Sequence, residues 1–218
     1  PLEMSMTGWG KTVYGLIIDS TDDATVNYDQ VIFSFDKKEK MAELKQGDQS
    51  GWLPIRLQWK VKDSSIDIDT QFYITVIKLD QDGFFRVRFF YNNLNKLITF
   101  PEEASDKLLE KTGPMVDFAD NFPPQLIFYP EDKGVFLKEA QASLDWHKSA
   151  VKPLIKDFNS QIILHDIYTP NQMLTSRWWL GYIDHNSKRY NDISDEEREK
   201  LWGEVMGMYQ GLDKIIGE

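Results

Sequence analysis

Cysteine is absent from the 218 residues of this chain. Disulfide bonds, thiolate metal sites and a cysteine nucleophile are therefore excluded. Long apolar runs are also absent: the first run, residues 13–18, is far shorter than the roughly 20 residues that a membrane-spanning helix needs. That run has no basic flank, so nothing resembles a secretory leader, and we expect a cytoplasmic protein. We expect a natural start at Met4 or Met6 and leave the residues before it out of the fold prediction.

Basic residues are in the minority, with 25 Lys and Arg against 35 Asp and Glu and a formal net charge of −10. A chain with this balance does not hold nucleic acid by charge over its whole surface. Apolar residues make up 41% and aromatic residues 13%. This composition supplies enough large side chains for a hydrophobic core and excludes global disorder.

The signature motifs of several enzyme classes are missing. No glycine-rich loop follows a strand pattern and opens a helix, so neither a dinucleotide site nor a P-loop is indicated. The Gly-x-Ser-x-Gly elbow and the HExxH metal motif are absent as well. A Ser-His-Asp set stays open, because its members need not be neighbours in sequence.

The first hundred residues alternate between apolar and polar side chains, which is typical of half-buried strands. Residues 81–83, Gln-Asp-Gly, have the composition of a hairpin turn. We expect a charged stretch, residues 37–45, to form a short helix or a loop. The expected strands are residues 12–19, 30–36, 53–61, 67–79 and 84–91. Together they predict a twisted antiparallel sheet of about five strands.

After Pro101 the apolar period shifts towards 3.6, which is typical of helices. We expect helices at residues 102–111 and 136–147, another helix that begins at Thr169-Pro170, and a strand at residues 161–168. Strands followed by helices indicate an α+β fold, with the sheet packed against the C-terminal helices. No Gly-, Pro- or Ser-rich linker separates the β-rich part, residues 8–100, from the helix-rich part, residues 101–218. We therefore predict a single domain.

The last helix has the clearest local signals. Ser194 and Glu197 are spaced as a capping box, which predicts the start of a helix. Small residues recur every four positions along it, at Gly203, Gly207 and Gly211, and small side chains let another backbone approach closely. We expect a close helix crossing within the fold, with a homodimer seam on this helix as the alternative.

Three histidines each stand near an aspartate in the helix-rich part. The contexts are Asp145-Trp146-His147, His165-Asp166 and Asp184-His185. Convergence of these side chains would suit a metal-dependent hydrolase. Their spacing matches no known ligand pattern, so we expect separate structural roles and predict no metal or other cofactor.

A nuclease-like carboxylate site is a second route to hydrolysis. Such sites combine an acid with an acid-x-Lys triplet to hold Mg²⁺ through oxygen ligands. Asp117 or Asp120, followed by Glu131 and Lys133, resembles that layout loosely. The same residues, 130–134, also have the composition of a turn and a helix start, and we assign no catalytic residue.

One face of the predicted sheet collects basic and aromatic side chains. If Leu53, Ile55, Leu57, Trp59 and Val61 face the core, the residues between them face the other way. The candidate binding residues on this opposite face are Arg56, Lys60, Lys62, Arg86, Arg88, Phe84 and Phe90. Arginine beside exposed aromatic rings is typical of binding hot spots, and the face would suit an acidic protein, a phosphate or a stacked single strand. The alternative is cross-strand pairing with Asp67 and Asp69, with the phenylalanines covered.

These observations favour a non-enzymatic protein that binds another protein. Its acidic surface would attract a basic partner through electrostatic steering, as an inhibitor or immunity-type protein does. The alternatives are a metal-dependent hydrolase or nuclease that uses Asp, His and Glu side chains, and a nucleotide or nucleic-acid binder that uses the basic sheet face. No membrane association is expected.

Overall fold

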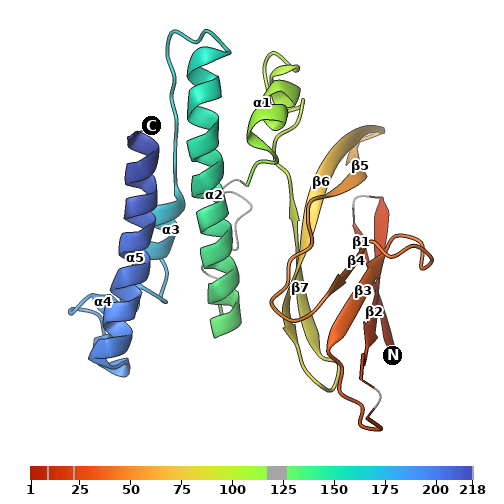
Figure 1. Cartoon of the computed structure of the whole chain (residues 1–218). Helices are drawn as coiled ribbons and strands as arrows, with labels where there is room; N and C mark the ends of the chain where they lie inside the picture. The colour runs from red at the N-terminus through yellow and green to blue at the C-terminus, as the bar shows by residue number, and fades with distance from the viewer. Residues whose placement is uncertain (9, 22, 117–126, 218) are drawn as a thin grey trace. The chain divides into compact units, whose positions relative to one another are not determined.

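The computed structural model describes residues 1–8, 10–21, 23–116 and 127–217 (Figure 1). The chain divides into two compact units, Pro1–Asn92 and Asn93–Glu218, which are described separately here. The first is built of strands and the second of helices, which confirms the predicted α+β class. The single domain stays a prediction. None of the helices in the described part of the chain is both long and apolar enough to cross a membrane.

The β unit contains two antiparallel sheets in which consecutive strands are neighbours. The four-stranded sheet comprises β1 (Leu2–Gly8), β2 (Lys11–Ile18), β3 (Gln30–Ser34) and β4 (Ala42–Leu44). The three-stranded sheet comprises β5 (Leu53–Val61), β6 (Ser64–Leu79) and β7 (Phe85–Tyr91). A register shift between Val76 and Lys78 makes β6 irregular opposite β7, as expected for so long a strand.

Both sheets contribute to one hydrophobic core. The four-stranded sheet supplies Val13, Ile17, Val31, Phe33 and Leu44, and the three-stranded sheet supplies Ile55, Phe72, Ile74, Val76 and Leu79. Leu53 and Leu57 pack at its margin as predicted, but Trp59 is 56% exposed. Trp59 lies near the turn end of β5, beyond the part of the hairpin that the core covers.

The arrangement of strands differs from the single sheet of about five strands that the sequence predicted. Two further strands come from segments without strong apolar alternation, β1 and β4. Residues 1–6 belong to the fold, because β1 pairs with β2 along its whole length. Backbone hydrogen bonds to a neighbouring strand, which the side-chain pattern does not reveal, place both segments in the sheet.

The predicted hairpin turn between β6 and β7 is present. The Gly83 N–H donates to the carbonyl of Asp80 at 2.8 Å, and Gly83 has a φ of +90°. A Cβ atom at this position would lie 2.3 Å from Cδ1 of Leu2. Glycine is therefore favoured by the backbone conformation, whereas the exposed Leu2 side chain could move away from a Cβ.

The helical unit is built around two long helices, α2 (Pro130–Lys156) and α5 (Asp195–Ile216), which run side by side in the same direction (Figure 1). The shorter elements are α1 (Ala104–Thr112), α3 (Thr169–Leu174), α4 (Leu180–Ile183) and the 3₁₀ turn η3 (Tyr190–Asp192). The predicted capping box starts α5, with the Glu197 N–H donating to Ser194 Oγ at 3.2 Å and the Ser194 N–H to Glu197 Oε2 at 2.9 Å.

The close helix crossing is confirmed at one of the three glycines of α5. A Cβ at Gly211 would lie 2.7 Å from Cδ1 of Leu144 on α2, whereas Gly203 and Gly207 have no atom within 4 Å of that position. The glycine spacing therefore predicted the crossing but not its location. The homodimer seam on α5 stays a prediction.

Candidate functional site

Several of the predicted basic residues share one face of the three-stranded sheet, whose centre is buried at Tyr73, Thr75 and Phe90. Arg56 opposes Asp69 and Lys60 opposes Ser65 across β5 and β6, while Arg88 opposes Thr75 across β6 and β7. Arg86 and Phe90 lie on the same face of β7, because core residues alternate with them. Lys62 lies in the turn between β5 and β6, and Phe84 precedes β7.

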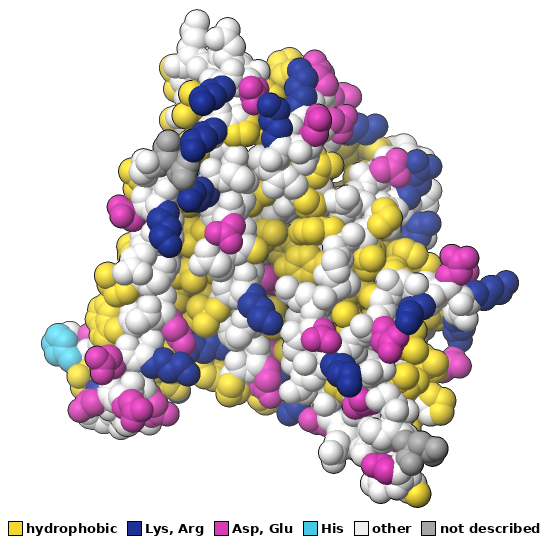
Figure 2. Space-filling model, viewed as in Figure 1, with side chains coloured by type: hydrophobic (Ala, Val, Ile, Leu, Met, Phe, Trp, Pro, Cys, Tyr) yellow, Lys and Arg dark blue, Asp and Glu magenta, His cyan; other side chains and the backbone are white. Residues whose placement is uncertain are grey.

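The charge of this face is partly neutralised. The guanidinium of Arg56 donates from Nε and Nη2 to the two carboxylate oxygens of Asp69, at 2.6 and 2.7 Å. This cross-strand pair is the one that the alternative interpretation predicted. Acidic and basic side chains are also interspersed over the surface that Figure 2 shows, without a large area of one sign.

The two phenylalanines of the predicted face differ in exposure. Phe84 is 56% exposed, but Phe90 is only 1% exposed. The ring of Phe90 stacks on Tyr73 at 5.2 Å between centroids, and Trp52 packs edge-on against Tyr73 at 4.9 Å. Packing across neighbouring strands therefore places Phe90 in an aromatic cluster, so it is not an exposed anchor, contrary to the expectation of an exposed ring.

Two of the three histidines meet in the helical unit. His147 of α2 is 4% exposed, and its Nδ1 lies 2.6 Å from Nε2 of His165, in the segment that connects α2 to α3. Burial, followed by the neighbouring His165, lowers the pKa of His147 to about 4, and burial lowers the pKa of His165 as well. Both rings are therefore neutral at pH 7. His185 is exposed and lies beside Asp184, apart from this pair.

The described acid of the nuclease-like pattern, Glu131, lies in the first turn of α2 beside Asp132. The carboxylate of Asp132 is fully buried and accepts the backbone N–H groups of Phe128 and Tyr129 at the start of α2. Lys133 forms an ion pair with Glu204 of α5 at 2.6 Å. Asp117 and Asp120 lie outside the described residues. Within the described residues, no three His, Asp or Glu side chains are placed to hold a metal ion.

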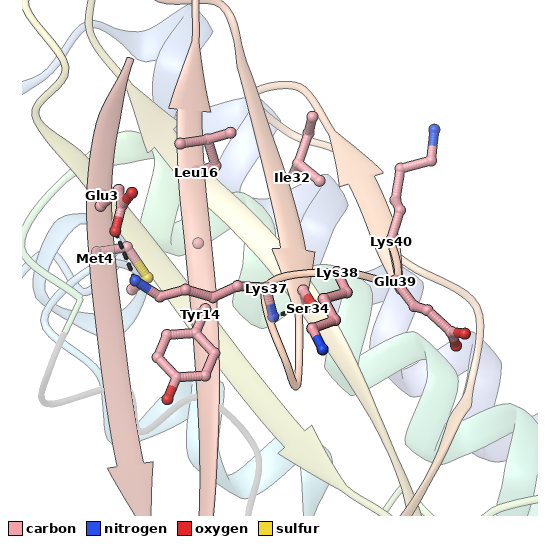
Figure 3. A pocket seen from close by; sticks show the side chains of 11 residues that line it. Glu3, Met4, Tyr14, Leu16, Ile32, Ser34, Lys37, Lys38, Glu39 and Lys40 are labelled. Atoms are coloured by element: carbon pink, nitrogen blue, oxygen red, sulfur yellow. Dashed lines mark hydrogen bonds and ion pairs between the residues drawn. The ribbon is translucent and has the colours of Figure 1, made fainter.

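A small hollow of about 180 Å³ lies on the four-stranded sheet (Figure 3). Tyr14, Leu16 and Ile32 line it, and Lys37 reaches over it to Glu3 at 2.7 Å. The Lys37 ammonium lowers the pKa of Glu3 below its usual value, through a hydrogen bond and through its charge. Because this exposed ion pair spans the hollow, the ammonium of Lys37 already has a partner.

The connecting segment, residues 157–168, is a feature that the sequence analysis did not select. It was predicted to contain a strand at residues 161–168, but no described strand pairs with it. Its apolar side chains face outwards: Ile162 is 82% exposed and Leu164 is 95% exposed. The sequence did contain a signal for this segment. A strand predicted between helices has no neighbouring strand in sequence with which to pair, so its side chains could be expected to stay exposed.

This segment runs as an elongated trace along α2 (Figure 1), and the contact between His165 and His147 attaches it there. Ile155 at the end of α2 and Tyr168 at the start of α3 are also exposed. Exposed apolar side chains thus occur along the connecting segment and at both of its ends, and exposed apolar side chains are a feature of interaction surfaces. In comparisons with known proteins, the chain matches no family model, no curated protein and no solved structure.

Proposed function

We propose that this chain is a non-catalytic interaction protein that binds a partner protein through the connecting segment. The observation that carries this proposal is the exposure of Ile162 and Leu164, at 82% and 95%. Burying a large aliphatic side chain contributes about 1.5–3 kcal/mol. Two such side chains separated by one residue form a small exposed apolar patch that a partner could cover.

The charge of the helical unit supports a basic partner. Residues 93–218 contain 21 acidic and 14 basic side chains. Such an excess attracts a cationic protein over a distance of about 10 Å, and apolar contact then holds it. An inhibitor or immunity-type protein that blocks a basic target is the most specific form of this proposal.

The basic sheet face and the nuclease-like residues give weaker support for a binding or catalytic site. On the basic sheet face, Arg56 is engaged by Asp69 and Phe90 is buried. In the nuclease-like pattern, Lys133 pairs with Glu204 of α5, and Asp132, the neighbour of Glu131, accepts backbone N–H groups at the start of α2. These side chains have structural partners that account for their positions, whereas no described contact accounts for the outward position of Leu164.

The test replaces both apolar anchors by lysine in the full chain, as Ile162→Lys with Leu164→Lys. Proteins retained from a native lysate by the wild-type chain are purified, and their affinity for both chains is measured by calorimetry. We expect the double variant to bind at least about 100-fold more weakly, because two apolar contacts are lost and positive charge is added.

The control variant is Ile216→Lys, which changes an equally exposed isoleucine, 77% exposed, at the end of α5. It should bind within about twofold of the wild type. Circular dichroism establishes that all variants remain folded. Equal affinity of the double variant and the wild type would contradict the proposal.

A further inference from the structure

Over seven consecutive residues, the backbone of the connecting segment has no hydrogen-bond partner in the part of the chain that the structure describes. No N–H or C=O group of residues 161–167 forms a hydrogen bond with any described residue. The side chain of His165 is held by His147, but the main chain on either side of it is open. Bonding resumes at Tyr168, whose carbonyl accepts the N–H of Asn171.

All side chains of residues 161–166 are exposed, but the two with the greatest apolar exposure are separated by one residue. Ile162 and Leu164 are among the most exposed apolar residues, whereas the intervening Ile163 is 38% exposed and His165 faces α2. Period-two alternation leaves successive N–H groups pointing to opposite edges of the segment. The segment therefore offers main-chain groups that no described residue pairs, with Ile162 and Leu164 exposed beside them.

Unpaired main-chain groups of this kind are a template for another extended chain. We infer that the partner supplies an extended, basic segment that pairs with residues 161–167 as an added β-strand. This inference rests on the proposed function and specifies how the partner binds. Main-chain hydrogen bonds would supply affinity, and Ile162 and Leu164 would select apolar side chains at alternate positions of the partner.

Charge favours such a partner over a second copy of this chain. Pairing two copies would bring together two helical units that each have seven more acidic than basic side chains. Like charges oppose that association, whereas a basic strand relieves the repulsion. The connecting segment itself carries no charged side chain other than Asp157, which pairs with Lys111, and Asp166, so the attraction for a cationic strand comes from the net charge of the whole helical unit.

The probe is a set of 12-residue peptides selected from a random display library for binding to the full chain. We expect the selected sequences to be basic and to alternate apolar and polar residues. Hydrogen exchange of the free chain should show residues 161–167 unprotected. Bound peptide should protect about half of these amides, those on the paired edge, by at least about tenfold.

Proline substitution tests the main-chain bonds directly. Ile163→Pro and Leu164→Pro each remove one N–H, and the two N–H groups point to opposite edges. Ile163→Ala and Leu164→Ala are the matched controls, because they shorten the same side chains and keep the N–H. We expect one proline variant to bind peptide about tenfold more weakly than its alanine control, and the other to match its control.

The outcomes separate this inference from the proposed function. If Ile162→Lys with Leu164→Lys abolishes partner binding while both proline variants match their alanine controls, the segment binds through side chains and the strand is wrong. If the free chain is a dimer whose protection of residues 161–167 depends on concentration, the partner is a second copy and the inference is likewise overturned. If neither pair of substitutions affects binding, the proposed function fails as well.

Discussion

His147 and His165 are the residues whose chemistry depends most on their surroundings. Burial, together with the neighbouring His165, lowers the pKa of His147 from 6.5 to about 4. Asp166 acts in the opposite direction on both rings, and among the described residues no charged group of α1, α3 or α5 contributes to either shift. The free energy of unfolding must therefore depend on pH through this pair.

Between pH 6.5 and about 4, the His147 imidazole is protonated in the unfolded chain but stays neutral in the native state. The stability contributed by the neutral ring is thus complete above pH 6.5 and is lost as the pH falls towards 4. We expect His147→Gln to reduce the acid loss of stability by about 2 kcal/mol, after allowance for solvent screening. Urea unfolding at several pH values measures this, with the exposed His185→Gln as control. An unchanged pH dependence in His147→Gln would contradict the assignment.

In the helix pair α2 and α5, the regularly spaced glycines of α5 have different surroundings. Gly203 is exposed and has open space around it, whereas Gly211 faces Leu144, which is 1% exposed. The same substitution should therefore have opposite effects at the two positions.

We expect Gly203→Ala to raise the free energy of unfolding by about 0.5–1 kcal/mol, because alanine favours the helix and nothing opposes its Cβ. Gly211→Ala should lower it by about 1–2 kcal/mol, because the new Cβ would overlap the packed Leu144. Denaturant unfolding measures both. In a Leu144→Ala background the cost of Gly211→Ala should disappear, and its persistence there would show that the crossing is not the cause.

Some strands and helices were predicted correctly from local sequence patterns, and others were not. Strict alternation predicted β5, and capping chemistry predicted the start of α5. The apolar pattern of residues 161–168 did not produce a paired strand, because a strand needs a neighbour and the described chain provides none there. This departure from the local pattern is where the candidate binding site lies.

For the whole molecule, the acidic excess predicts that the association rate of a basic partner depends on salt. A net charge of −10 should accelerate the encounter with a cationic chain, and salt should screen that attraction. Raising the salt concentration from about 0.02 M to about 0.5 M should lower the association rate of a selected basic peptide about tenfold, with less change in its dissociation rate. Stopped-flow fluorescence measures both rates. The matched control is the same peptide with lysines replaced by glutamine, and equal salt dependence of the two peptides would contradict steering.

By itself, the sequence determined the α+β class, most strand and helix positions, the turn at Gly83 and the shared face of Arg56, Lys60, Arg86, Arg88 and Phe90. These features depend on periodicity, capping and turn chemistry within a few residues of one another. Only the tertiary structure decided that the strands divide into two sheets, that Asp69 neutralises Arg56, that Phe90 is buried and that His147 meets His165. It also decided that Ile162 and Leu164 remain exposed, because burial and pairing depend on which distant segments meet.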